Sequence, residues 1–135
     1  MDSSNRELRP PADAVSPAMT YLAVALAWLV PGAGHVFLNR RGRGVAFLVI
    51  VLATIGLGCA LQGELYRGVA QPIETLATLA CAGMGLPYFV LRGLGYTGDI
   101  DSAGFEYGKA FVLTAGLMNI LLILDAWDIA RGEKE

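Results

Sequence analysis

Three polar side chains in or beside apolar stretches carry most of the chemistry that this sequence offers. His35 is the only histidine and follows a Pro-Gly pair, Asn119 lies inside an apolar run, and Asp125 comes directly after that run. An imidazole titrates near neutral pH, and ionisable groups within apolar segments often belong to proton or ion pathways. We therefore take His35, Asn119 and Asp125 as candidate functional residues, with proton or ion transfer as their chemistry.

Each of these side chains also has a structural interpretation. His35 could satisfy backbone groups that a helix break at Pro31 leaves free. Asn119 could bond a neighbouring helix, and Asp125, which precedes Trp127, could lie at the depth of lipid headgroups. The residue types alone are compatible with either interpretation.

The sequence holds no constellation that is typical of catalysis or cofactor binding. Cys59 and Cys81 fall inside apolar runs, where cysteines act as small packing residues, and no Cys-x-x-Cys pair occurs. Residues 99–104 begin like a calcium loop, but Ala103 and Ala110 occupy the fifth and twelfth ligand positions. We therefore expect no metal, no cofactor and no enzymatic activity. The net charge of −2 gives no reason to expect a nucleic-acid partner.

Apolar residues are concentrated in long runs, and these runs predict the fold. The chain of 135 residues is 55% hydrophobic and 16% charged, whereas soluble domains carry about 25% charged residues. We expect an all-α integral membrane bundle of about four hydrophobic helices, the first broken at Pro31. A disordered polar tail over 1–17 would precede one membrane domain over 18–131. The expected helices cover about 18–38, 44–61, 72–90 and 107–130.

The densest positive charge lies between the first two expected helices. Arg40, Arg41 and Arg43 form a basic loop, which could bind anionic headgroups or act only as the signal that keeps a short loop cytoplasmic. Four crossing helices would divide the lysines and arginines five against five between the two sides. A first segment that enters and returns would give seven against three, which the positive-inside rule favours. We expect four crossing helices and a cytoplasmic basic loop, and leave the side of the N-terminus open.

Small residues recur four positions apart, at helical spacing, in and beside the expected helices. Such spacing lets helices approach closely in lipid. We therefore expect compact packing and association with a second copy or with a larger membrane complex. The pairs are Gly56 and Ala60, Ala77 and Cys81, Cys81 and Gly85, and Gly104 and Gly108.

Residues 31–44 resemble a motif of small bacterial membrane proteins, PG-x-G-[HQ]-x-[YF]-x-G-R…G. They read PGAGHVFLNRRGRG, with Asn39 at the position of a glycine. More distantly, they resemble the TM2 domain, in which two helices flank a Gly/His/aromatic turn. Residues 107–130 are similar to the end of an uncharacterised bacterial multi-pass family. These resemblances imply a helical fold and a bacterial inner membrane, and no reaction.

The expected function is that of an accessory membrane component. We expect a multi-pass protein of the inner (plasma) membrane that packs with lipid, with itself or with a membrane complex, and is not an enzyme. The alternative is a small transporter or channel subunit with a polar path near His35, Asn119 and Asp125.

Overall fold

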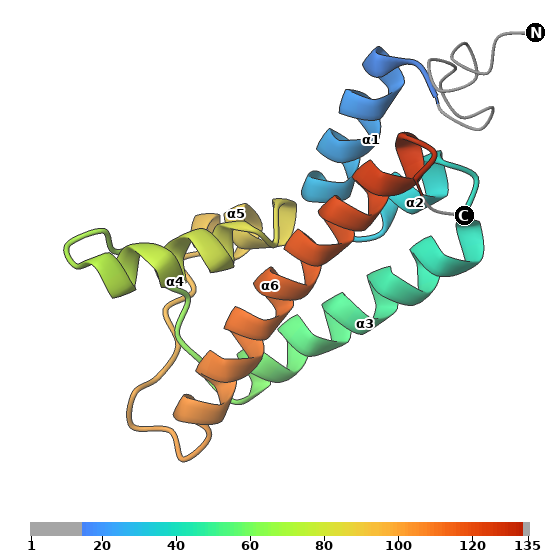
Figure 1. Cartoon of the computed structure of the whole chain (residues 1–135). Coiled ribbons are helices and arrows are strands. Elements are labelled where there is room, and N and C mark those ends of the chain that lie inside the picture. Colours follow the sequence, from blue (N-terminus) through green and yellow to red (C-terminus); the bar gives the residue numbers. More distant parts are fainter. Residues whose placement is uncertain (1–14, 134–135) are drawn as a thin grey trace, which may run out of the picture.

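A computed structural model describes residues 15–133, and within them the chain forms six α-helices and no strand. The all-α prediction is therefore confirmed. Most of the predicted tail over 1–17 lies outside the described residues, and Pro17 already belongs to the first helix. The helices, labelled in Figure 1, are α1 Pro17–Leu29, α2 Ala33–Phe37, α3 Arg41–Ala60, α4 Pro72–Ala82, α5 Leu86–Gly93 and α6 Phe105–Ala130.

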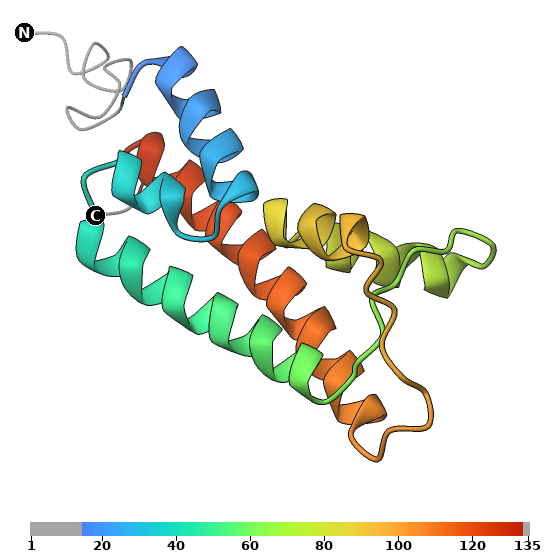
Figure 2. The same cartoon turned by 180° about the vertical axis from the view of Figure 1, so that it is seen from behind.

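Two long helices, α3 and α6, run antiparallel and side by side (Figure 1, Figure 2). With 20 and 26 residues, they extend about 30 and 39 Å, and both are long and apolar enough to cross a membrane. Close approach needs glycine: a Cβ added at Gly58 of α3 would lie 2.7 Å from Cγ2 of Val112 on α6. We call the end where α3 begins and α6 ends the arginine end, and the opposite end the loop end.

The α1–α2 pair enters from the arginine end and returns to it. The backbone N–H of Val15 donates to the carbonyl oxygen of Ala130, at the end of α6, over 3.1 Å. From there α1 runs toward the middle of α6, and α2 leads back to the start of α3 (Figure 2). The turn between them follows from two residues. Pro31 lacks a backbone donor, and Gly32 has a φ of +82°, a left-handed conformation that only glycine adopts without strain.

The α4–α5 pair enters from the loop end and returns to it. The two helices are bent by 108° at the break between them. The segments before and after the pair bond each other: the N–H of Asp99 donates to the carbonyl of Gln62 over 3.1 Å. The hydroxyl of Tyr96 donates to the carbonyl of Gly63 over 2.8 Å. Burial raises the pKa of Tyr96 to about 12, so this hydroxyl remains a donor even in mildly alkaline solution.

The number of crossing helices is smaller than the four that the sequence predicted. Two helices are long and apolar enough to cross alone, and a third crossing exists only if the bent α4–α5 pair counts as one span. The expected helices over 18–38 and 72–90 are each divided in two, whereas those over 44–61 and 107–130 are found with slightly earlier starts. The predicted break at Pro31 is confirmed. The 13 residues of α1 extend only about 20 Å, too short for a bilayer core of about 30 Å.

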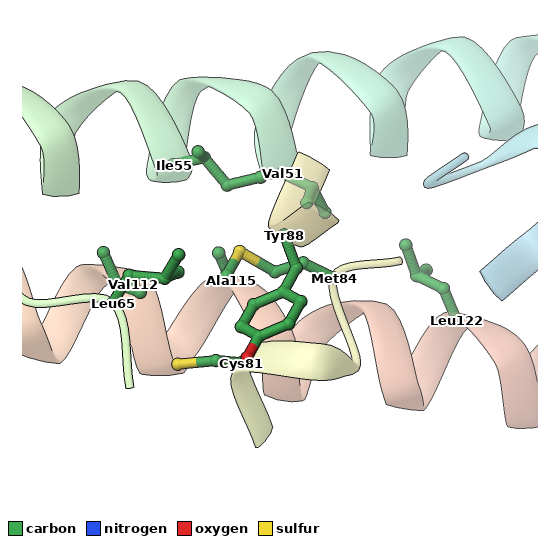
Figure 3. Close-up of a cluster of buried hydrophobic side chains, with 9 residues drawn as sticks. All are labelled: Val51, Ile55, Leu65, Cys81, Met84, Tyr88, Val112, Ala115 and Leu122. Atoms are coloured by element: carbon green, nitrogen blue, oxygen red, sulfur yellow. The ribbon is translucent and has the colours of Figure 1, made fainter. Parts of the chain in front are cut away.

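A cluster of buried apolar side chains joins the α4–α5 pair to both long helices (Figure 3). Helix α6 approaches α4 at Gly116, where an added Cβ would collide with the carbonyl oxygen of Ala80. Cys81, a free thiol, is fully buried here and acts as a packing residue. The cluster consists of Val51, Ile55, Leu65, Cys81, Met84, Tyr88, Val112, Ala115 and Leu122.

Candidate functional site

His35 and Asp125, 90 residues apart in the chain, form a direct hydrogen bond. Nε2 of His35 donates to Oδ2 of Asp125 over 2.8 Å. The histidine side chain is fully buried, whereas the side chain of Asp125 is 30% exposed. The pair therefore connects a buried imidazole to a carboxylate that reaches the surface near the arginine end.

Helix α2 packs against α1 through Gly34 and carries His35 to α6 and α3, where its ring lies edge-on to Phe47 with 5.0 Å between the ring centroids. Gly34 makes this possible, because an added Cβ there would lie 2.7 Å from the carbonyl oxygen of Ala23 and 2.7 Å from Cβ of Ala27. Nδ1 of His35 is buried and has no partner among the described residues. The ring is thus oriented by Asp125 and by packing, and it does not satisfy the backbone groups freed at the first helix break.

Asn119, in the middle of α6, satisfies backbone groups at both helix breaks. Its Nδ2 donates to the carbonyl oxygens of Gly83 over 2.8 Å and of Trp28 over 3.3 Å. In a continuous helix the carbonyl of Gly83 would bond the N–H four residues on, but that residue is Pro87, which has none. Trp28 lies in the last turn of α1, where carbonyls lack helical partners. Its indole Nε1 in turn donates to the carbonyl of Ala82 over 3.1 Å, so the two breaks also contact each other.

The structure brings two of the three candidate residues together and sets the third apart. Asn119 lies six residues before Asp125 on α6, about 9 Å along the helix axis. Its Oδ1 is buried without a partner in the described part of the chain. All five residues between Asn119 and Asp125 are leucine or isoleucine, and Leu122 among them is buried. The predicted polar path through all three residues is therefore not formed by direct contacts.

Sequence reasoning missed Trp28 and the carbonyl of Gly83 as parts of this arrangement. The signal that could have found them is the pair of Gly/Pro-interrupted, short apolar segments. In membrane proteins such broken helices leave backbone groups that a neighbouring side chain must satisfy.

The predicted basic loop is partly helical. Arg40 precedes α3, and Arg41 and Arg43 form its first turn. Asn39 has a φ of +65°, a left-handed conformation that asparagine tolerates better than most residues, which explains how it replaces the glycine of the motif. Positive side chains at a helix N-terminus oppose the helix dipole, so the dipole does not explain why these arginines lie there. Their two expected roles, headgroup binding and topology, stay predictions.

Both helix breaks line an apolar cleft of about 370 Å³. Val30 and Pro31 come from the first break, and Leu86 and Pro87 follow the second. Every residue of its lining is apolar, whereas substrate pockets carry a few polar groups that orient the ligand. The cleft therefore offers a hydrocarbon surface and no catalytic group. Within residues 15–133, no three His, Cys, Asp or Glu side chains are placed to hold a metal ion.

Residues 22–135 match a family of unknown function, DUF6677. No curated protein and no solved structure matches the chain. The match supplies no activity, and the bacterial origin and TM2 likeness that the motif implied stay predictions.

We predict that Asn119→Leu lowers the free energy of unfolding by about 1–3 kcal/mol, because the isosteric apolar side chain leaves two carbonyl oxygens without a donor. Unfolding of the detergent-solubilised protein, followed by tryptophan fluorescence, measures this, since Trp28 lies at the affected contact. Met118→Leu, at the neighbouring half-buried position, is the matched control and should change stability little. Equal unfolding midpoints for the two variants would contradict the role assigned to the Asn119 amide.

Proposed function

The chain belongs to the DUF6677 family of unknown function, and we propose that it is a multi-pass membrane protein without enzymatic activity. It would act by packing, through the outward face of α3, with a second copy of itself or with a larger membrane complex. The observation that carries this proposal is a line of small residues along that face.

The outward surfaces of the two long helices support a membrane setting. Val49 on α3 is 61% exposed and Leu121 on α6 is 64% exposed, and both lie far from their helix ends. Apolar surface of this kind is unfavourable in water and favourable against lipid tails. The lipid bilayer is therefore the first proposed partner. The inner (plasma) membrane is the proposed location because the motif of residues 31–44 resembles bacterial membrane proteins.

The small-residue line runs along α3 on the side opposite its buried residues. Its six positions alternate steps of four and three residues, which places them on one helix face. Five of the six are glycine or alanine, and larger exposed side chains such as Ile50 and Leu57 flank them. A face of this composition lets a second helix approach closely. The line consists of Gly42, Ala46, Val49, Ala53, Gly56 and Ala60.

Glycines elsewhere in the small-residue pairs have contacts inside the molecule. Gly104 packs against Leu61, and Gly108 packs against Gly63. A Cβ added at Gly56, by contrast, would meet nothing within 4 Å. Glycine lowers helix stability by about 1 kcal/mol relative to alanine. A glycine in the middle of α3 without an internal contact therefore favours an external one.

We propose that the arginine end faces the cytoplasm. Short segments with clustered arginines are retained on that side of a membrane, where they would also contact anionic lipid headgroups. The net charge of −2 leaves nucleic acid outside the proposed partners. Among the described residues, the arginine end holds Arg40, Arg41, Arg43 and Arg131, and the loop end holds Arg67, Arg92 and Lys109.

The His35–Asp125 hydrogen bond favours a second candidate function, a small transporter or channel subunit. A buried imidazole bonded to a partly exposed carboxylate can take up one proton from the surface and hold it inside. Asn119 would contribute to this function by fixing the helix breaks rather than by carrying the proton.

We predict that Gly56→Leu prevents self-association without unfolding the protein, because the larger side chain fills the line where the second helix would approach and meets nothing in its own chain. Native mass spectrometry of the detergent-extracted protein measures the oligomeric state. Ala110→Leu, at an exposed alanine of α6, is the matched control and should assemble like the wild type. A wild type that is monomeric and brings no partner with it would refute the packing function.

Labelling of single cysteines in intact cells tests the membrane arrangement. In a background of Cys59→Ala and Cys81→Ala, we expect Arg41→Cys to be shielded from an impermeant maleimide. Val69→Cys and Ile100→Cys, exposed positions before α4 and after α5, should both react. If Val69→Cys and Ile100→Cys label on opposite sides, the α4–α5 pair crosses the membrane. If the protein fractionates with soluble proteins, the membrane proposal fails.

For the second candidate, we predict proton flux into proteoliposomes that is lost in Asp125→Asn and His35→Ala, because each variant removes one member of the bonded pair. A pH-sensitive dye inside the vesicles measures the flux. Asp101→Asn, an exposed carboxylate at the loop end, is the control and should keep it. Absent flux, or flux unchanged in the two variants, removes this candidate.

A further inference from the structure

A polar pocket of about 230 Å³ lies at the loop end of the molecule. Its walls are the segment 64–68, which connects α3 to α4, together with Glu74 in the first turn of α4 and Thr97 after α5. Three charged side chains line it, and they carry both signs: Glu64, Arg67 and Glu74. None of these residues takes part in the contacts at the helix breaks or in the His35–Asp125 pair.

The guanidinium of Arg67 is held by the backbone and not by a carboxylate. Nη2 donates to the carbonyl oxygen of Tyr96, and Nε is buried with no partner in the described chain. Across residues 15–133, Arg67 forms no ion pair within 4.0 Å. Its positive charge is thus partly withdrawn from water without being neutralised, a state that an approaching anion would relieve.

The two carboxylates of the pocket are likewise kept apart from the guanidinium. Glu74 has room only because the residue beside it is Gly68: an added Cβ there would lie 2.9 Å from Cγ of Glu74 and closer still to the carboxylate. Neither Glu64 nor Glu74 forms an ion pair or a hydrogen bond with another described side chain. Opposite charges that line one pocket without pairing fit a ligand that itself carries both signs.

The segment 64–68 has no regular secondary structure, but side chains from α4 and α5 hold its backbone in place. Oγ1 of Thr78 on α4 donates to the carbonyl of Gly68 over 2.7 Å. The hydroxyl of Tyr88 on α5 donates to the carbonyl of Tyr66 over 3.2 Å. A wall that is already ordered loses little conformational freedom when a ligand binds.

We propose that this pocket binds a phosphoethanolamine group, with the phosphate against Arg67 and the primary ammonium against Glu64 and Glu74. Guanidinium and phosphate form strong charge-assisted hydrogen bonds, and an ammonium has three donors for carboxylate acceptors. The group could belong to a lipid headgroup or to a free metabolite. The pocket lies just beyond the end of α3, at headgroup depth if α3 spans a membrane. The lipid source therefore rests on the proposed membrane function, whereas the pocket chemistry does not.

Lipid retention by the full-length protein tests the proposal. Native mass spectrometry in detergent compares phosphatidylethanolamine with phosphatidylcholine, whose ammonium donates no hydrogen bond, and with phosphatidylglycerol, which has no ammonium. We expect phosphatidylethanolamine to be retained about tenfold more than phosphatidylcholine or phosphatidylglycerol. A tenfold difference in affinity corresponds to the loss of about one charge-assisted hydrogen bond. Glu64→Gln and Glu74→Gln should each remove most of this preference. Glu106→Gln, an exposed carboxylate at the same end that pairs with Lys109, should keep it.

Free phosphoethanolamine separates the two sources of the group. It should raise the unfolding temperature of the wild type and of Glu106→Gln, but not that of the two pocket variants. Stabilisation by the free compound without selective lipid retention would support the pocket and overturn the lipid source. Equal retention of all three lipids with no stabilisation by the free compound would overturn the proposal. The proposal would also be overturned if Glu64→Gln and Glu74→Gln are as stable as the wild type and bind phosphoethanolamine as the wild type does. If the protein proves to be soluble, only the membrane proposal is refuted, because the test with free phosphoethanolamine does not require a membrane.

Discussion

The side-chain amide of Asn119 is the contact on which the arrangement of the helices depends. Two pairs of short helices end inside the molecule, each at a carbonyl that has lost its helical partner, and Nδ2 of Asn119 reaches both carbonyls. A buried carbonyl without a donor costs about 1–3 kcal/mol. The donor that α6 supplies at that depth therefore stabilises both helix ends. Gly116 adds to this by letting α4 lie against the backbone of α6.

Because both short pairs are held against α6 by Asn119, the outer side of α3 has no packing partner in the described chain. The α1–α2 pair approaches from the arginine end and the α4–α5 pair from the loop end, and both pack toward α6 (Figure 1). The chain thus repeats one order of elements, a helix, a break, a short helix and a long helix. The second long helix, α6, contacts α1, α3 and α4, although the face that holds Leu121 stays exposed. The small-residue line of α3 faces outward because no other element of the described chain packs against it, which is why the proposed interface lies there.

The two ends of the molecule differ in how they hold charge. At the arginine end, Arg40, Arg41 and Arg43 gather where the helix dipole is also positive, and Asp125 and Asp128 lie in the last turns of α6 at the same end. At the loop end, Arg67 and Glu74 are held apart around a pocket by fixed backbone. The partner we propose for the first end is an anionic leaflet, and the one we propose for the second is a single small group. If α3 and α6 cross a bilayer, the arginine cluster and the polar pocket lie on opposite sides of it.

The sequence by itself determined where the two long helices form and that the first helix breaks at Pro31, but not that the expected helix over 72–90 is divided into α4 and α5. The runs that became α3 and α6 are long and apolar, and the break at Pro31 is a local consequence of a missing N–H. His35, Asn119 and Asp125 could be selected because polar groups in apolar runs are rare. Only the tertiary structure decided how many helices are long enough to cross a membrane and which of these residues meet. The return of each short pair depends on contacts between distant segments, such as Asn119 with Gly83. Such contacts form only when two segments pack at the same level along α6. Neither the apolar periodicity of a segment nor the position of its proline specifies that level.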